Sequence, residues 1–287
     1  MNIYKRLLIP ILLHFSVLFL FGQRGAQDTW YLDKELQLPD MPGLSDPFGL
    51  AFSSDGDSYV VDHSNDSVTI WDSNGTFKKR WGANGSNEGQ INNPRDIAIA
   101  GNEVYIVDHS NHRVQVFDLN GTFLRKWGTY GSGDGQFSSP YAIALDLNGS
   151  AVSKVWIADY NNHRVQAFDS NGTFLSKFGT YGNNDSQLYY TTGVAIGPDD
   201  LLYVSSRYHN KVKVFETNGT YVRSITAVGR VYDLDFSGDQ FAVCASDNHR
   251  VQIFDKNSSQ TRLELSPTAR TTSGVCQIWP RTIVSFF

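Results

Sequence analysis

One motif recurs along most of this chain, and its spacing restricts the folds that the chain can adopt. Residues 108–123 read DHSNHRVQVFDLNGTF, and residues 159–174 read DYNNHRVQAFDSNGTF. The motif returns with changes at 62–77, 205–221 and 247–255. Alignment on its valine gives spacings of 46, 51, 47 and 39 residues, through Val68, Val114, Val165, Val212 and Val251. Repeats of about 40–50 residues made only of strands predict the blades of a β-propeller.

A single repeat, residues 97–127, has room for four strands. Residues 97–100 contain two alanines and suit an inner strand near a crowded axis, and residues 104–107 are a β-rich run that predicts a buried second strand. Residues 114–117 predict a third strand, because polar and apolar residues alternate there. The Asn120-Gly121 turn then leads to an outer strand of mixed polarity at 122–127. The fold class is therefore all-β.

The ends of the repeated region predict how the propeller closes. Residues 274–276 mirror 193–195, so a sixth inner strand is expected there, although only 11 residues follow Cys276. Residues 30–38 resemble an outer strand, and pairing strands from both termini would remove exposed sheet edges. We predict a propeller over 27–287, six-bladed with a composite, incomplete last blade. The repeats are 46–90, 91–136, 137–187, 188–226 and 227–265, and a partial blade at 266–287 is closed by 28–40.

These motifs resemble the NHL-repeat family. That family has a proline before the inner strand, an aspartate ending the second strand, Asn-x-Arg-Val opening the third and Gly-x-Phe leading into the fourth. The second and third repeats match throughout. The first has Ser67 in place of the arginine, and the fourth has Ser205 for the aspartate and Lys211 for the arginine. The fifth keeps residues 247–251 but lacks the Asn-Gly turn.

The N-terminal segment differs from the repeats. Lys5 and Arg6 precede an apolar run over residues 7–21, and small residues follow, with Gly25-Ala26 as a cleavage point. This order is typical of a signal peptide over 1–26, lying outside the fold, and predicts a secreted, extracellular protein. The alternative is an uncleaved anchor that leaves the propeller membrane-anchored outside the cytosol, but the run is shorter than the ~20 residues of a membrane span.

Charge and cysteine content limit the classes of partner. Residues 1–26 hold three of the 24 basic side chains and none of the 29 acidic ones, so the remainder has a formal net charge of −8. That balance repels phosphate backbones and argues against nucleic acid, including the RNA that some NHL domains bind. Cys244 and Cys276 form either one disulfide in an oxidising compartment or two buried thiols.

Two sets of residues invite a catalytic or metal-binding interpretation. The pairs Asp108–Arg113 and Asp159–Arg164 recur with the repeat, which favours a loop clamp over catalysis, since catalytic residues occur once per site. His63 and His109 hold equivalent loop positions, and a propeller could bring them together. Peptidyl-hydroxyglycine lyases, which use NHL-like repeats, bind zinc through histidines. The sequence shows no local ligand spacing, so we expect no cofactor, metal or catalytic residue. The sequence also has no RING-like segment, so the ubiquitin-ligase activity of some NHL proteins is not expected here.

Nine Asn-x-Ser/Thr sequons predict glycosylation of a secreted chain. They are Asn65, Asn74, Asn84, Asn120, Asn148, Asn171, Asn184, Asn218 and Asn257. Four of them, at 74, 120, 171 and 218, are also the Asn-Gly-Thr hairpin turns, so turn chemistry accounts for the same residues.

A binding surface is expected where the loops between second and third strands meet the blade crossings, on one face of the propeller. Exposed tyrosine, arginine and histidine are favoured in interfaces. The residues predicted to bind are His63, Arg95, His109, Tyr141, Tyr160, Arg207, Tyr208 and Arg230. We therefore expect a non-catalytic scaffold that binds an extracellular protein or glycan, the alternative being a metal-dependent lyase or hydrolase.

Overall fold

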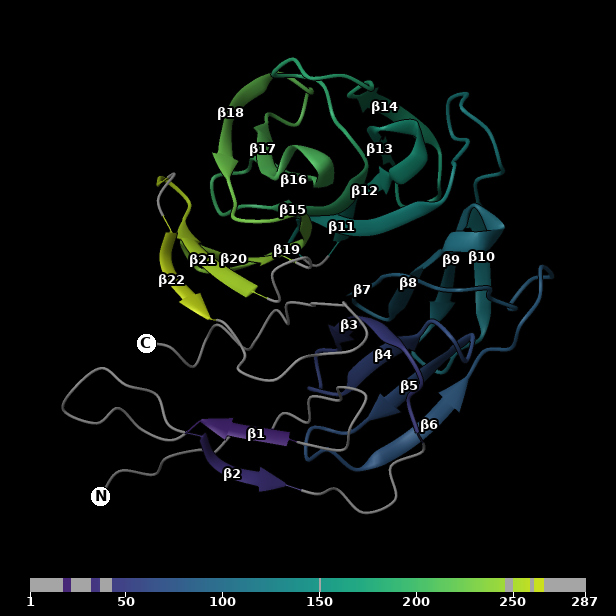
Figure 1. Ribbon diagram of the computed structural model, residues 1–287. Coiled ribbons are helices and arrows are strands. Elements are labelled where there is room, and N and C mark those ends of the chain that lie inside the picture. Colours follow the sequence, from purple (N-terminus) through teal and green to yellow (C-terminus); the bar gives the residue numbers. More distant parts are fainter. Residues whose placement is uncertain are drawn as a thin grey trace.

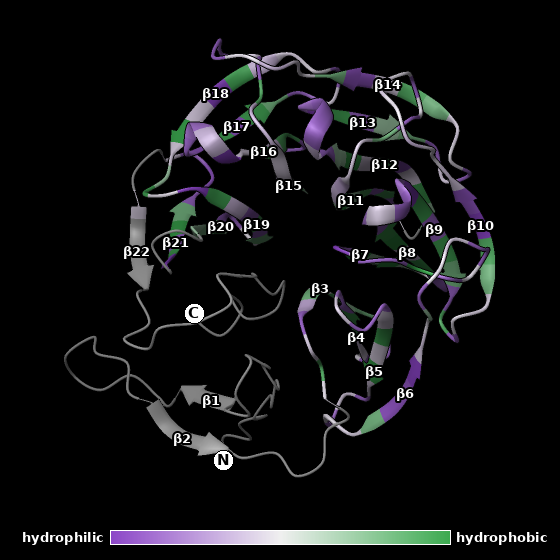
Figure 2. Cartoon of the chain, turned by 45° about the vertical axis from the view of Figure 1, so that its right-hand side comes forward, coloured by the Kyte–Doolittle hydropathy of each residue, from purple (hydrophilic) through white to green (hydrophobic). Residues whose placement is uncertain are grey.

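Five blades surround a common axis in the computed structural model (Figures 1 and 2). The structure describes residues 43–149, 151–245 and 250–258, together with strands at 18–21, 32–36 and 261–265. Within those residues, each blade is a four-stranded antiparallel sheet whose strands follow one another in sequence order. Three short 3-10 turns are the only other regular elements among the residues described. The described part of the chain has no helix with the length and apolar character needed to cross a bilayer.

From the axis outward, the first blade consists of β3 (Pro47–Phe52), β4 (Ser58–Asp62), β5 (Ser67–Trp71) and β6 (Phe77–Trp81), and the second of β7 (Ile97–Ala100), β8 (Glu103–Asp108), β9 (Arg113–Asp118) and β10 (Phe123–Trp127). The third blade consists of β11 (Pro140–Asn148), β12 (Ala151–Asp159), β13 (Arg164–Phe168) and β14 (Phe174–Phe178), and the fourth of β15 (Thr191–Ile196), β16 (Leu202–Ser206), β17 (Lys211–Phe215) and β18 (Tyr221–Thr226). The fifth consists of β19 (Val231–Ser237), β20 (Gln240–Ala245), β21 (Arg250–Asp255) and β22 (Thr261–Leu265). The four strands expected at 97–127 are thus confirmed.

The predicted sixth blade is not confirmed, because its C-terminal part at 266–287 lies outside the described residues. Within 28–40, β2 (Leu32–Leu36) forms a strand, and its partner is β1 (Leu18–Phe21). That partner lies inside the segment expected to be a signal peptide, so the placement of 1–26 outside the fold is not confirmed. Cys244 is buried in β20 and disulfide-bonded, whereas Cys276 lies outside the described residues.

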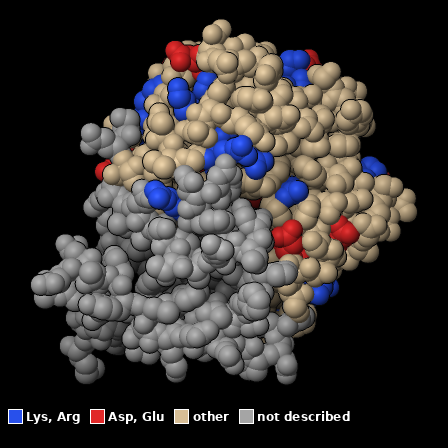
Figure 3. Space-filling view, viewed as in Figure 1, with Lys and Arg blue, Asp and Glu red and all other residues tan. Residues whose placement is uncertain are grey.

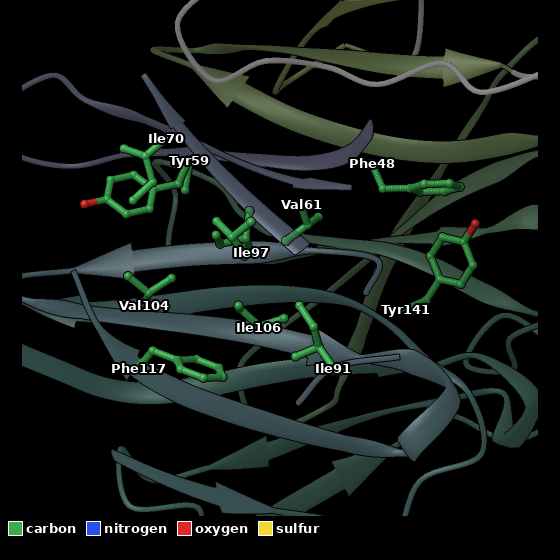
Figure 4. Packing of buried hydrophobic residues seen from close by; sticks show 12 residues of the cluster. Phe48, Tyr59, Val61, Ile70, Ile91, Ile97, Val104, Ile106, Phe117 and Tyr141 are labelled. Atoms are coloured by element: carbon green, nitrogen blue, oxygen red, sulfur yellow. The ribbon is translucent and has the colours of Figure 1, made fainter. Parts of the chain in front are cut away.

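Apolar side chains fill the space between adjacent blades. Val61 and Ile70 of the first blade pack with Ile97, Val104 and Ile106 of the second in one buried cluster (Figure 4). Similar clusters join the second blade to the third, the third to the fourth and the fourth to the fifth. The two middle strands of each blade are buried on both faces, which explains their near-continuous Val, Ile and aromatic content.

The Asn-Gly hairpin turns contribute a second contact between blades. Gly121 has φ +82°, and a Cβ added there would lie 2.5 Å from the ring of Trp81 on the preceding blade. Gly172 is placed in the same way against Trp127. Glycine is required in these turns for two reasons, the left-handed backbone and the ring packed directly on it.

A buried ion pair fastens each of the second and third blades to the crossing that leads into it. Arg113 donates from Nε to Asp108 (2.7 Å), and its other nitrogens donate to the carbonyl oxygens of Ser86, Asn87 and Gln90 at 2.7–2.9 Å. Asp108 also accepts the backbone N–H of Asn92 at 2.7 Å. One guanidinium therefore satisfies a buried carboxylate and three loop carbonyls.

The third blade repeats this arrangement. Arg164 donates to Asp159 at 2.8 Å and to the carbonyls of Ser132, Gly133 and Gln136 at 2.7–2.8 Å. The loop-clamp interpretation of both pairs is confirmed by these bonds.

The fourth blade corrects one expectation from sequence. Strand register pairs Ser206 with Lys211, as it pairs Asp108 with Arg113, so Ser206 and not Ser205 occupies the aspartate position. The cation is also displaced, because Lys213 reaches the crossing in place of Lys211. Its buried Nζ donates to the carbonyls of Asn184, Asp185 and Gln187 at 2.6–3.0 Å. One ammonium thus supplies donors to three carbonyl oxygens of the crossing.

Replacement of Arg113 by methionine is expected to destabilise the protein by about 3–5 kcal/mol, because Asp108 would keep a buried charge without its partner. The matched control is Lys78→Met, which removes an ion pair to Asp57 from a half-exposed side chain. That change is expected to cost about 0–1 kcal/mol. Urea unfolding measures both, and equal losses in the two variants would contradict a structural role for the buried clamp.

Candidate binding site at the mouth of the axis

The inner strands enclose a cavity of about 420 Å³ along the propeller axis. At one end, equivalent positions of the five inner strands form a ring of side chains. These are Phe48, Arg95, Tyr141, Thr192 and Tyr232. Four of them are the second residue of their strand, and Arg95 lies two residues before β7 with its N–H bonded to the carbonyl of Val107, so all five stand at the same height. We call this ring and the loops around it the mouth.

A second ring lies around the first and arises from the 3-10 turns after the second strands. His109, Tyr160 and Arg207 are each the first residue of such a turn, directly after a strand that has ended. His63 follows Asp62 at the same position of the first blade. The next residue in the fourth blade is Tyr208, which is 39% exposed.

All eight residues predicted to bind lie in one continuous contact network. Tyr141 is at its centre, with ring centroids 5.8 Å from His109 and 5.5 Å from Tyr160. Arg95 lies 4.9 Å above the Tyr141 ring and also over Phe48, which contacts His63. Figure 4 shows Phe48 and Tyr141 near each other at one end of the buried cluster.

The fourth and fifth blades complete the network. The Arg207 guanidinium lies 5.5 Å from the centre of the Tyr208 ring, and that of Arg230 lies 4.6 Å from it. Arg207 also donates to the Tyr160 hydroxyl at 3.3 Å, which connects this part to Tyr141.

Sequence reasoning missed four members of the mouth: Phe48, Thr192, Tyr232 and Tyr190. The first three could have been found by equivalence, because they occupy the same repeat position as Arg95 and Tyr141. Tyr232 hydrogen-bonds Tyr141 through the two hydroxyls, and the ring centroids are 5.6 Å apart. Tyr190 packs 4.6 Å from Tyr160, and only the crossing that carries it brings it there.

Arginine makes the mouth basic on a chain that is acidic as a whole. Arg95 and Arg207 donate to the hydroxyls of Tyr141 and Tyr160, and within the described residues neither forms an ion pair with a carboxylate. On the face turned towards the viewer in Figure 3, Lys and Arg side chains gather near the middle of the described part. Such a local patch attracts anionic groups despite the net charge of −5.

Deeper in the cavity the side chains are acidic. Asp96, Asp233 and Asp235 line it, and protein surrounds their carboxyl groups. Burial raises the pKa of Asp96 to about 7 against the opposing effect of two backbone N–H donors, and it raises the pKa of Asp235 to about 7. Burial, with the neighbouring Asp96, also raises the pKa of Asp233. Carboxyl groups held in this way keep protons near neutral pH.

Burial shifts the pKa values of the histidines in the mouth downwards, in the direction opposite to those of the carboxyl groups. Burial, with a smaller contribution from the nearby Arg95, lowers the pKa of His109 to about 4. His109 Nδ1 donates to the carbonyl oxygen of Pro140 at 2.9 Å, so the neutral ring already has a partner. Burial, then Arg95, also lowers the pKa of His63. Among the described residues, no group of three His, Cys, Asp or Glu side chains could hold a metal ion.

His109 should make stability depend on pH. Its folded pKa of about 4 is below the unfolded value near 6.5, so its contribution is complete above pH 6.5 and is lost as pH falls towards 4. His109→Asn keeps a donor for Pro140 and removes the titration. Between pH 7 and 4.5, wild type should lose about 2–3 kcal/mol more unfolding free energy than the variant. Parallel pH profiles from urea unfolding would refute this assignment.

Comparison with known proteins agrees with the fold and the repeat. The NHL repeat family matches residues 92–117, in the second blade. A stretch of 116 residues, 38% of this chain, is 32% identical to "Protein brain tumor" of Drosophila melanogaster and spans 11% of that protein. The resemblance to the NHL-repeat family is thereby confirmed, while this chain matches only a small part of that relative.

Two lyases are among the solved structures similar to this one. A streptogramin B lyase superposes with a TM-score of 0.61 at 15% identity, over 82% of this chain and 72% of the lyase. Virginiamycin B lyase from Staphylococcus aureus gives the same TM-score and identity over 86% and 77%. At such identities the likeness establishes the propeller fold and does not extend to the activity.

Proposed function

We propose that this chain is a secreted, non-catalytic NHL-repeat scaffold that binds a protein or glycan partner at the mouth. In this proposal the ring has six blades, the last completed by segments from both ends of the chain. The observation that carries the binding role is the convergence of tyrosine and arginine from four blades on one mouth. These residue types dominate the energetics of interfaces, and two of the arginines have no carboxylate partner in the described chain.

The positions of the sequons support a secreted chain. All nine asparagines are exposed. Six of them, at 74, 120, 148, 171, 218 and 257, lie in hairpins between first and second or third and fourth strands. Because successive strands are antiparallel, those hairpins lie at the opposite end of the blades from the mouth. Glycans on them would leave the mouth accessible.

Expression in a secreting eukaryotic cell tests the secretory part. The expected product lies in the medium, begins near residue 26 or 27, and loses mass on treatment with an N-glycosidase. Changing Asn120 and Asn171 to Gln should each remove one glycan, since both side chains are exposed. A product that stays in the cell with Met1 as its N-terminus would overturn secretion by cleavage.

Capture from extracellular fluid tests the binding part. The double variant Arg207→Ala/Tyr208→Ala should retain at least tenfold less of any partner held by wild type, because loss of hot-spot residues costs about 2 kcal/mol or more. The control Leu124→Ala changes a 45% exposed side chain on an outer strand, away from the mouth. Equal recovery by the two variants would place the interface elsewhere.

A metal-dependent lyase or hydrolase is the second candidate, and the likeness to lyase propellers is what favours it. It requires ligands that converge on one point, and zinc needs three or four. Elemental analysis of the purified chain separates the candidates. Stoichiometric metal that is lost in a His63→Ala/His109→Ala variant would favour the enzyme.

A further inference from the structure

A continuous line of tyrosine rings runs from the axis to the rim of the propeller. In order, it comprises Tyr232, Tyr141, Tyr160, Tyr190, Tyr189 and Tyr181. Successive ring centroids are 5.6, 5.5, 4.6, 5.3 and 5.1 Å apart. The line begins in the mouth and ends at Tyr181, which is 61% exposed on the crossing between the third and fourth blades. We call it the tyrosine track. An elongated surface of this kind fits an extended chain better than a compact small molecule.

The axial end of the track is basic. Arg95 lies 4.9 Å from the centre of the Tyr141 ring, and Arg207 lies 4.8 Å from that of Tyr232. Tyr141 and Tyr232 are joined through their hydroxyls, so each guanidinium lies over one member of this pair. The Nε of each arginine is buried and has no hydrogen-bond partner among the described residues. An acidic group placed between them would receive charge-assisted hydrogen bonds in a partly desolvated position.

Stacking within the track limits what its rings can bind. Tyr190 lies 4.6 Å from Tyr160 at 33° and 5.3 Å from Tyr189 at 23°. His163 packs against the same ring at 4.6 Å. The ring faces are thus occupied by one another, which leaves to a ligand the ring edges and whatever hydrogen-bonding capacity the hydroxyls retain beyond their bonds to Arg95, Arg207 and each other. Bases stack on open aromatic faces, so the track lacks the platform that single-stranded nucleic acid uses.

We propose that the tyrosine track binds an extended acidic peptide segment of a partner protein. A carboxylate of the peptide lies between Arg95 and Arg207, and its chain runs outward over the tyrosine hydroxyls to an apolar side chain against Tyr181. Charge complementarity selects the acidic end, and the single basic pole fixes the direction in which the peptide lies. This inference rests on the proposed binding function and specifies its ligand.

Selection of random dodecapeptides displayed on phage against the full secreted chain tests the proposal. Enriched peptides should carry Asp or Glu, and their binding should weaken as salt increases. The best peptide is then measured by fluorescence polarisation. Its Glu→Gln form should bind wild type about tenfold more weakly, while the Arg95→Gln/Arg207→Gln variant should bind both forms equally. No enrichment, or enriched peptides without acid, would overturn the proposal.

A matched pair of tyrosines tests the outer end of the track. Tyr181→Ala should weaken the peptide about tenfold. Tyr130→Ala is the control, because Tyr130 occupies the equivalent place on the preceding crossing, is 71% exposed and packs on His112 outside the track. Both side chains are exposed, so these variants should fold even where the arginine variant does not. Equal effects of the two changes would show that the peptide does not contact Tyr181 at the outer end of the track.

Competition with a sulfated oligosaccharide and a single-stranded oligonucleotide separates the possible occupants. Neither should displace the acidic peptide at equal charge concentration. If one of them binds at the mouth more tightly than any selected peptide, the peptide proposal fails while the proposed binding function stands. If, in addition, capture of a partner does not depend on Arg207 and Tyr208, both the peptide proposal and the proposed binding function fail.

Discussion

The buried cation that holds the crossings into the second, third and fourth blades is the interaction on which the arrangement of the mouth depends. A crossing has no strand partner for most of its length, so its carbonyl oxygens need donors from elsewhere. Arg113, Arg164 and Lys213 each supply donors to three of them. The same crossings lead into the inner strands and therefore fix where the ring of Arg95, Tyr141 and Thr192 stands around the axis.

This dependence connects stability with the proposed function. The clamps lie beneath the face that carries the 3-10 turns, and those turns present His109, Tyr160 and Arg207 to the mouth. Side chains on a braced scaffold lose little conformational freedom on binding, which favours affinity. Arg95 and Arg207, which have no carboxylate partner among the described residues, thus stand on a backbone that other cations hold in place.

How far the sequence predicts the fold differs between regions. The four strands of the second repeat and the clamps in the second and third blades follow from local pattern, since turn chemistry and strand alternation act over a few residues. The fourth blade differs from the pattern of the motif, because Lys213 lies two positions beyond the place of the arginine and still reaches the crossing. Alignment by residue type favoured Ser205, whereas strand register selects Ser206.

The sequence by itself determined the repeat, the turn residues and the residue types offered on the loop face, because each of these is encoded within one repeat. Only the tertiary structure decided that side chains about 50 residues apart, such as Arg95 and Tyr141, touch one another. It also placed Asp96, Asp233 and Asp235 in one cavity and lined up six tyrosines from axis to rim. The physical reason is circular packing, which brings equivalent positions of successive blades together around one axis.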